Sequence, residues 1–389
     1  MLNLKDDLRS IQEKGLYRKL TTVCSPSGPR VRIDGRDVLM MASNDYLGLC
    51  CHPRIIKRAQ EALELWGAGS GASRLISGNS PLFCELEHKL ANFKQTEAAL
   101  VFSTGYMANA GILTALAGEH DVIYSDELNH ASIIDGCRLS RAKVEIYPHC
   151  RMNALQGLLE KSPGYRRRLI VTDGIFSMDG DMAPVPDLLS LARRYDAALI
   201  IDDAHGTGVL GARGKGILEH FGLSGETDIT VMGTLGKALG CFGAFVAGSS
   251  DVKELLINCS RSFIFTTALP PAVIASALEA LQIVEDEPEQ RTKLASSVLF
   301  MQKGLKEIGF NTLQSCTQIM PIMIGNPETA VAMARHLFEQ GLFIQAIRPP
   351  TVPEGSSRLR LTVMATHTRQ DMEQALDILK KAGEKFRII

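Results

Sequence analysis

The sequence predicts an α/β fold, with a mostly parallel seven-stranded sheet flanked by helices and a smaller C-terminal α+β domain. Short apolar runs alternate with stretches of helical periodicity. Strands of a parallel sheet are apolar along their whole length because helices cover both faces of the sheet. The seven runs are 98–102, 121–125, 143–147, 168–172, 197–202, 229–233 and 243–248. The connection between the last two is too short for a crossover helix, so we expect these strands to be antiparallel.

Three helices and one strand are expected before the sheet. The charged, amphipathic start predicts a helix within residues 1–20, and a short apolar run predicts a strand at 38–42. A helical pattern over 53–66 ends at a glycine. Another over 81–93 has a serine before it as N-cap and a proline at its first position. The glycine- and serine-rich stretch 67–80 is expected to be a loop.

After the sheet, residues 269–285 have the pattern of a long helix that leaves the large domain. The remainder reads helix, strand, helix, strand, strand, helix, which is typical of a small α+β domain. An acidic stretch at 285–289 marks the boundary. We therefore expect an N-terminal helix and strand segment at 1–45, a large α/β domain at 46–288 and a small domain at 289–389.

The composition favours a globular protein and gives no sign of nucleic-acid or membrane binding. Hydrophobic residues make up 45% of the chain and charged residues 22%, which suits a large buried core. The formal net charge of −1 gives no reason to expect a polyanionic partner. The cysteines form no CxxC pair, the start lacks the apolar core of a signal peptide, and no apolar stretch approaches roughly 20 residues. We expect reduced cysteines and a cytoplasmic location.

A lysine in a tight turn carries the first functional signal. Lys237 follows the run 229–233, and a small-residue turn presents its amine at a strand end. Another run ends in Asp202, and His205 follows three residues later. A lysine after a strand is most often a surface charge, but an amine held near a carboxylate and an imidazole suits pyridoxal phosphate. The amine can form a Schiff base with the aldehyde, and the carboxylate can keep the ring nitrogen protonated.

Polar segments follow several of the predicted strands. They are 103–106, 129–132, 176–180, 202–205 and 234–237. Ligands bind at the carboxyl ends of the strands in an open α/β sheet, so the fold would bring these segments together. Each has a structural alternative: 103–106 could cap a helix, Asp202 could cap a turn, and the histidines could be ordinary hydrogen-bonded residues. The glycine-rich stretch lacks the GK[ST] ending of a nucleotide-binding loop.

Seven motifs occur in order along almost the whole chain. They are SNDYLGL (43–49), GAGSGASRLISGN (67–79), STGYMANAG (103–111), NHAS (129–132), FSMDGD (176–181), DDAHGTGVLG (202–211) and TLGKALG (234–240). In this combination the sequence resembles the α-oxoamine synthases. The resemblance implies a fold-type I pyridoxal-phosphate transferase that condenses an amino acid with an acyl thioester and releases CO2. It also implies a homodimer.

The resemblance implies a role for each residue that matches a family motif. Lys237 matches the Schiff-base lysine, Asp202 the partner of the ring nitrogen, and His205 the group that bonds the ring hydroxyl. His130 matches the imidazole stacked on the ring, and Ser177 a residue near the ring hydroxyl and the substrate. All of these except Ser177 are expected to be catalytic.

The same resemblance implies how the cofactor phosphate is held. Gly105, Tyr106 and Thr234 match phosphate contacts from the same chain. Thr266 and Thr267 match a phosphate contact that reaches across the dimer interface. No metal site is expected.

For the substrates, Asn44 and Arg360 match groups that hold the amino-acid carboxylate. Arg18 and Thr351 are expected on the acyl side. Some family members carry an arginine where Tyr17 falls, and the nearest arginine here is Arg18, so this chain departs from the family pattern at that point.

The segment IRPPTVPEGSSRLRLTVMATHT (347–368) resembles the branch of the family that joins alanine to a pimeloyl thioester in biotin synthesis. The thioester could be carried on CoA or on an acyl-carrier protein. Glycine C-acetyltransferase, 5-aminolevulinate synthase and serine palmitoyltransferase use the same chemistry and remain alternatives. A regulator domain would need a DNA-binding segment and basic charge, and a nicotinamide enzyme would need GxGxxG after the first strand. The sequence has neither.

Overall fold

The computed structural model describes residues 2, 4–13, 16–161 and 164–389, and the chain forms two compact units. The sheet unit comprises Asp45–Ser177 and Asp181–Thr292. The terminal unit comprises Met1–Asn44, Met178–Gly180 and Lys293–Ile389, and so joins both ends of the chain to a short segment from its middle. The sequence-based boundaries kept the two ends apart, because local patterns carry no information about contacts between distant segments.

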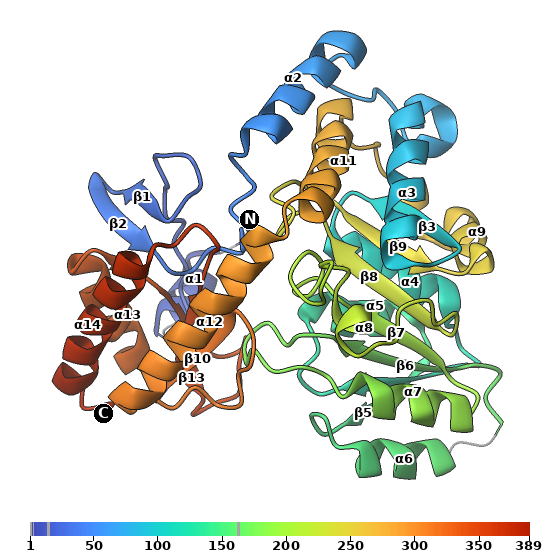
Figure 1. The fold of residues 1–389 in the computed structure, drawn as a ribbon. Coiled ribbons are helices and arrows are strands. Elements are labelled where there is room, and N and C mark those ends of the chain that lie inside the picture. The colour runs from blue at the N-terminus through green and yellow to red at the C-terminus, as the bar shows by residue number, and fades with distance from the viewer. Residues whose placement is uncertain (1, 3, 14–15, 162–163) are drawn as a thin grey trace. The chain divides into compact units, whose positions relative to one another are not determined.

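A seven-stranded sheet forms the middle layer of the sheet unit (Figure 1). Its strands lie in the order β3-β9-β8-β7-β6-β4-β5. Their bounds are β3 (Ala98–Phe102), β4 (Val122–Asp126), β5 (Lys143–Tyr147), β6 (Arg168–Asp173), β7 (Ala198–Asp202), β8 (Ile229–Thr234) and β9 (Ala244–Gly248). β9 is antiparallel to β8 and β3, and the other pairs are parallel. The predicted fold class is confirmed.

Helices cover both faces of this sheet, and this explains why the strands read as apolar runs. In β6, Leu169 and Val171 pack in one core with α4 and α5, and Ile170 packs in the opposite core with α6 and α7. The helices of the unit are α2 (Pro53–Trp66), α3 (Pro81–Lys94), α4 (Gly105–Leu116), α5 (Ala131–Ser140), α6 (Met152–Glu160), α7 (Val185–Arg194), α8 (Ile217–His220), α9 (Ser250–Cys259), α10 (Arg261–Ile264) and α11 (Pro271–Asp286).

Two local features of the sheet unit differ from the prediction. A π-helix, η1, lies at Arg74–Gly78, within the stretch expected to be a loop. Ser80 has the extended backbone of an N-cap before α3, but its side chain makes no capping hydrogen bond. Its carbonyl oxygen accepts from the N–H of Phe83 at 3.0 Å instead, and its hydroxyl is buried without a partner among the described residues.

The terminal unit contains two small sheets, β1-β2-β11 and β10-β13-β12. Their strands are β1 (Arg30–Ile33), β2 (Arg36–Met40), β10 (Ile319–Gly325), β11 (Leu342–Phe343), β12 (Gln345–Ile347) and β13 (Ser357–Thr362). Its helices are α1 (Leu4–Glu13), α12 (Glu289–Ile308), α13 (Pro327–Glu339) and α14 (Arg369–Lys385), and α12 begins in the last residues of the sheet unit. Strand β1 and one of the three short strands after α13 were not predicted.

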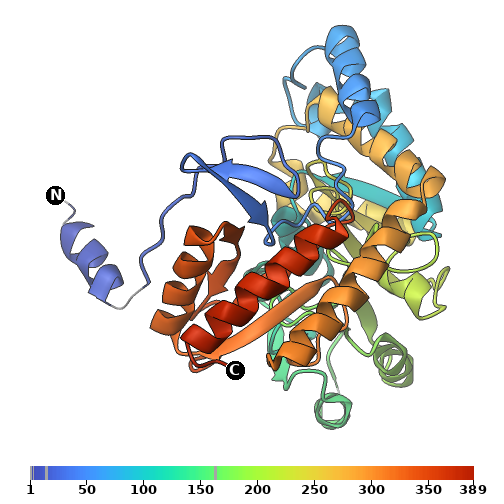
Figure 2. The same ribbon diagram turned by 60° about the vertical axis from the view of Figure 1, so that its left-hand side comes forward.

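Figure 2 shows α13 and α14 lying together beside the β10-β13-β12 sheet of the terminal unit. This packing buries the apolar side of β13, on which Leu359 and Leu361 are fully buried. None of the described helices is both long and apolar enough to cross a membrane.

Candidate active site

Lys237 lies in a turn between β8 and β9, and that turn is held by its own hydrogen bonds. The Thr234 hydroxyl donates to the carbonyl of Gly243 at 3.1 Å and accepts from the N–H of Gly236 at 3.2 Å. The N–H of Gly240 donates to the carbonyl of Lys237 at 2.8 Å. The turn therefore fixes the start of the lysine side chain at the end of a buried strand. Thr234, a predicted phosphate contact, holds this turn.

The Lys237 amine contacts an imidazole that is itself oriented by a buried tyrosine. Its Nζ lies 3.1 Å from Nε2 of His205, and Nδ1 of His205 lies 2.7 Å from the hydroxyl of Tyr46. Tyr46 is fully buried. The two predicted residues thus meet, although 32 positions separate them. Tyr46 was not predicted individually, but it lies within the SNDYLGL motif.

Asp202 is a buried carboxylate that is held by neutral donors. Its side chain lies at the end of β7, and the residue is 4% exposed. The Asn109 amide donates to one carboxylate oxygen at 2.7 Å, and the N–H of Ala204 donates to the other at 2.9 Å. Among the described residues, none forms an ion pair with it. A buried carboxylate in this state is stabilised by a cationic partner.

The next residue, Asp203, has a different partner. Its carboxylate pairs with Nζ of Lys94 at 2.7 Å, and both side chains are almost completely buried. The Lys94 amine also donates to the hydroxyl of Thr207 at 2.8 Å. Because successive residues of a strand face opposite sides of the sheet, the two carboxylates point apart, and Asp203 anchors the following loop through Thr207 and Ile217.

A hydrogen-bonded chain connects Asp202 to His130. The Asn109 amide also donates to the hydroxyl of Ser132 at 2.8 Å, and that hydroxyl lies 2.8 Å from Nδ1 of His130. The N–H of Ser132 donates to the same Nδ1 at 3.2 Å. Nδ1 is therefore an acceptor, which places the proton of a neutral His130 ring on Nε2.

The environment of His130 favours this neutral form. Desolvation by the surrounding protein lowers the pKa of His130, although part of the residue is exposed. The negative charge of Asp202 raises this pKa, and the positive charge of Lys237 lowers it further. A neutral ring with its proton on Nε2 is a hydrogen-bond donor at neutral pH. Asn109 and Ser132 were missed as individual residues, although both lie within motifs that the sequence singled out.

Asp173 is a further buried carboxyl group that the sequence reasoning missed. It accepts from the N–H of His130 at 2.6 Å, and its own N–H donates to the side-chain oxygen of Asn129 at 2.9 Å. Burial, and then the nearby charge of Asp202, raise the pKa of Asp173 well above its usual value. An acidic residue at the end of the apolar run RLIVT was the available signal.

The start of α4 offers backbone donors at the predicted phosphate site. The hydroxyl of Thr104 caps this helix by accepting from the N–H of Met107 at 3.1 Å. The N–H groups of Gly105 and Tyr106 are in the first turn, where an α-helix supplies no partner. The Tyr106 hydroxyl donates to Asp135. Thr266 and Thr267 follow α10, where Thr267 is exposed and Thr266 half-buried.

Ser177 is the last residue of the sheet unit before the chain enters Met178–Gly180. On the return, Asp181 accepts from His149, whose other ring nitrogen lies 3.0 Å from Asp126. Burial alone would lower the pKa of His149, but the two carboxylates outweigh it and raise the pKa to about 12. His149 is therefore a cation that holds the segment next to Ser177, and it was not predicted.

Two predicted substrate residues meet in the terminal unit. Arg360 is buried on β13 and donates to the side-chain oxygen of Asn44 at 3.2 Å. Two residues earlier on the same strand, Arg358 pairs with Asp179 at 2.6 Å. Adjacent positions on one face of β13 thus carry two buried guanidinium groups.

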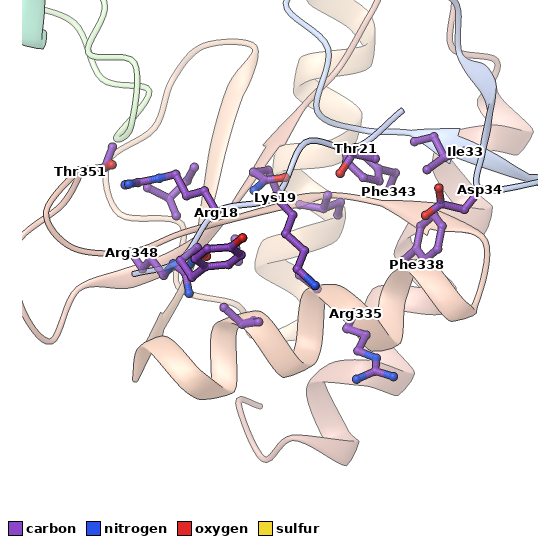
Figure 3. A pocket seen from close by; sticks show the side chains of 17 residues that line it. Arg18, Lys19, Thr21, Ile33, Asp34, Arg335, Phe338, Phe343, Arg348 and Thr351 are labelled. Atoms are coloured by element: carbon purple, nitrogen blue, oxygen red, sulfur yellow. The ribbon is translucent and has the colours of Figure 1, made fainter. Parts of the chain in front are cut away.

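Arg18 and Thr351, the residues expected on the acyl side, line one cavity of about 430 Å³ in the terminal unit (Figure 3). Tyr17 lines it as well. The structure thus brings together Lys237 with His205, Asn44 with Arg360, and Arg18 with Thr351. Their roles toward cofactor and substrates stay predictions.

Comparisons with known proteins place the chain in a family. The profile of the aminotransferase class I and II family matches residues 36–379. The chain belongs to the aminotransferase class I and II family. An 8-amino-7-oxononanoate synthase of Geobacter sulfurreducens is 53% identical, and the match covers 100% of this chain and 99% of the relative. One of Thermoanaerobacter pseudethanolicus is 48% identical, with 99% and 98% covered.

Solved structures of the family share this fold. A serine palmitoyltransferase from S. paucimobilis with bound PLP and myriocin has a TM-score of 0.94 at 32% identity, and the match covers 99% of this chain and 98% of that one. An 8-amino-7-oxononanoate synthase from Francisella tularensis has a TM-score of 0.78 at 30% identity, with 90% and 99% covered. Both activities therefore occur on this fold.

Proposed function

We propose that the chain is a PLP-dependent acyltransferase that condenses L-alanine with a pimeloyl thioester in biotin biosynthesis. The products are 8-amino-7-oxononanoate, CO2 and the free thiol. Curated relatives with this activity in their name are 46–53% identical over almost the whole chain, which supports this substrate pair over the other members of the family. The fold, the order of motifs and the Lys237 site support the class of chemistry.

The observation that carries the proposal is the buried carboxylate of Asp202, hydrogen-bonded to neutral donors in the unit that also holds the Lys237–His205 pair. These residues fit PLP, because the pyridinium nitrogen is the cation that Asp202 needs. When bound, PLP supplies an electron-withdrawing ring and an aldehyde that joins to an amine. Lys237 would hold the aldehyde carbon, His205 the ring hydroxyl with Ser177 nearby, and His130 one face of the ring.

The phosphate end would be held by backbone groups and hydroxyls. In this proposal the N–H groups of Gly105 and Tyr106, together with Thr234, bind the phosphate of their own subunit's cofactor. The helix dipole of α4 favours a dianion at this end. Thr266 and Thr267 would complete the phosphate site of a second copy.

The chain's own residues then position alanine and move its proton. Arg360, oriented by Asn44, binds the alanine carboxylate through its planar fork of N–H donors. Nζ of Lys237 takes the proton from the alanine α carbon and later returns a proton to the product carbon. The Nε2–H of His130 donates to the acyl carbonyl oxygen as negative charge develops there.

We further propose that the enzyme is a cytoplasmic homodimer. Large apolar side chains of the sheet unit are exposed around the end of α2 and along η1, and they include Leu65 at 76% and Ile76 at 81% exposure. We infer that these apolar side chains belong to an association surface. A second copy would cover them and bring Thr266 and Thr267 to its partner. Sedimentation across a dilution series would test this, since dissociation should release PLP.

Steady-state kinetics with alanine, glycine and serine against pimeloyl, acetyl and palmitoyl thioesters test the activity. We expect the alanine and pimeloyl pair to have the highest kcat/KM. Each methylene missing from the acyl chain removes up to about 0.8 kcal/mol of burial, so acetyl-CoA should be worse by well over tenfold. Equal values for acetyl and pimeloyl donors would overturn the substrate assignment but not the reaction class.

One observation favours serine palmitoyltransferase as a second candidate. Solved structures of that enzyme have TM-scores of 0.88 to 0.94 to this chain, above the value of 0.78 for a solved 8-amino-7-oxononanoate synthase. The serine and palmitoyl arm of the same assay decides this candidate.

A further inference from the structure

The cavity in the terminal unit has a wall of unusual charge. Its volume is about 430 Å³, and it lies between the N-terminal segment around residues 17–21, helix α13 and the strands β11 and β12 (Figure 3). Four cationic side chains line it, and the described residues of the lining include a single carboxylate. The cations are Arg18, Lys19, Arg335 and Arg348, and the carboxylate is Asp34. This local excess of three positive charges contrasts with a net charge of −1 for the whole chain.

Most of this charge is available to a ligand. Within the described part of the chain, neither Arg18 nor Lys19 forms an ion pair, and both are exposed. Arg335 contacts Glu339 on the same helix at 3.3 Å, a solvent-exposed pair that contributes little energy. Arg348 donates to the carbonyl of Tyr17 at 2.8 Å and so ties the N-terminal segment to the cavity wall.

The rest of the wall is apolar or neutral. Phe338, Phe343 and Ile347 contribute carbon surface, while Thr21 and Gln345 contribute neutral polar groups. Cavities of about 300 to 1,000 Å³ suit ligands of drug size, whereas a pimeloyl group has only about ten non-hydrogen atoms. The cavity is therefore larger, and carries more cations, than one terminal carboxylate requires.

We propose that this cavity binds the phosphate end of the phosphopantetheine arm that carries the acyl group. The inference rests on the proposed function, because only an acyl-thioester enzyme needs such a site. This phosphate is part of a diphosphate in CoA and a phosphodiester on a carrier protein, and in both it offers negatively charged acceptor oxygens, which suit a cluster of arginine and lysine donors. The amide and methylene groups of the arm suit the mixed wall. CoA and an acyl-carrier protein share this phosphate, so the cavity recognises either donor.

A thioester with the phosphate end of the arm and one without it test the proposal. Pimeloyl-CoA contains it, and the pimeloyl thioester of N-acetylcysteamine does not. The variant carries Lys19→Gln and Arg335→Gln, which remove two cavity charges. Lys303→Gln is the matched control, because Lys303 is also an exposed cation paired with a glutamate four residues on, and it does not line the cavity.

We expect the double variant to raise KM for pimeloyl-CoA about tenfold, given the usual strength of exposed charge contacts, with little change in kcat. The kcat/KM for the N-acetylcysteamine thioester, and both values for Lys303→Gln, should stay at wild-type levels. Equal losses for both thioesters would mean that the cavity binds the acyl chain, and no loss for either would mean that it binds neither part. Both outcomes overturn the proposal.

Two further measurements separate the sources of the phosphate and the underlying function. Pimeloyl carrier protein should show the same rise in KM as pimeloyl-CoA. A rise for only one of the two donors would contradict recognition through the phosphate that they share. Calorimetry should detect binding of 4′-phosphopantetheine to the wild type, at least about tenfold weaker binding of pantetheine, and weaker binding of the phosphate form by the double variant. This readout needs no turnover, so it holds even if the proposed reaction proves wrong.

Discussion

The two units carry charge in contrasting ways. In the sheet unit, Asp202 is 4% exposed and its oxygens are fixed by Asn109 and a backbone N–H. In the cavity of the terminal unit, Arg18 and Lys19 are exposed and without ion pairs among the described residues. Fixed groups in a site with little water stabilise charge that develops during a reaction, whereas flexible exposed cations attract and hold an anionic substrate. We therefore expect substitutions in the sheet unit to affect rate and those in the terminal unit to affect binding.

Lys237→Ala should have the largest effect. Loss of the amine removes both the proposed cofactor attachment and the proposed base, so kcat should fall by more than about 10³-fold. The turn bonds made by Thr234 remain, and the far-UV circular dichroism and thermal midpoint should be close to wild type. A variant that turns over at the wild-type rate would show that the amine has no such role.

Asp202→Asn should come next. An amide is nearly the same size but carries no charge to hold a protonated ring nitrogen, so we expect kcat to fall by about 10²-fold or more. Asp203→Asn is the informative comparison, because Asp203 faces Lys94 instead of the site. It should lower the free energy of unfolding, measured with urea, more than Asp202→Asn does. The opposite pattern would contradict the roles given to the two carboxylates.

Arg360→Ala should affect binding instead of rate. A hydrogen bond to a charged group contributes roughly 1.5–3 kcal/mol, so KM for alanine should rise by about one to two decades while PLP affinity is unchanged. Arg360→Lys keeps the charge but not the fork, and should restore only part of the affinity. If KM for the thioester rises instead, Arg360 belongs to the other substrate.

His149→Gln should have the smallest effect on kcat and should change the pH dependence of the free energy of unfolding. Asp126, Asp181 and Cys150 surround this ring, and its pKa of about 12 lies above the ordinary value near 6.5. The protonated ring therefore stabilises the fold fully below about pH 6.5, and this contribution falls as the pH rises toward 12, by at most about 1.4 kcal/mol per pH unit. Urea unfolding at pH 7 and 9.5 should show that the free energy of unfolding declines less in the variant than in the wild type. Equal declines would exclude a cationic His149.

Local patterns in the sequence determined much of the fold. Apolar runs, helical periodicity and glycine or proline positions are set by residues a few places apart, and they predicted the seven strands and the antiparallel pair at β8 and β9. Because the carboxyl ends of neighbouring strands meet at one edge of a sheet, they also placed Lys237 and His205 together. The class of chemistry followed from that convergence and from the motifs.

Only the tertiary structure decided which residues support the site and which ends of the chain belong together. Tyr46 reaches His205 across 159 positions, and Asn109 reaches Asp202 across 93. The two small sheets join β2 to β11 and β10 to β13. Such pairs leave no periodic trace, because periodicity reports which face of an element is buried and not which side chain lies opposite it. The hydrogen-bonding state of His130 and the charge of His149 depend on those partners, so they too came from the structure alone.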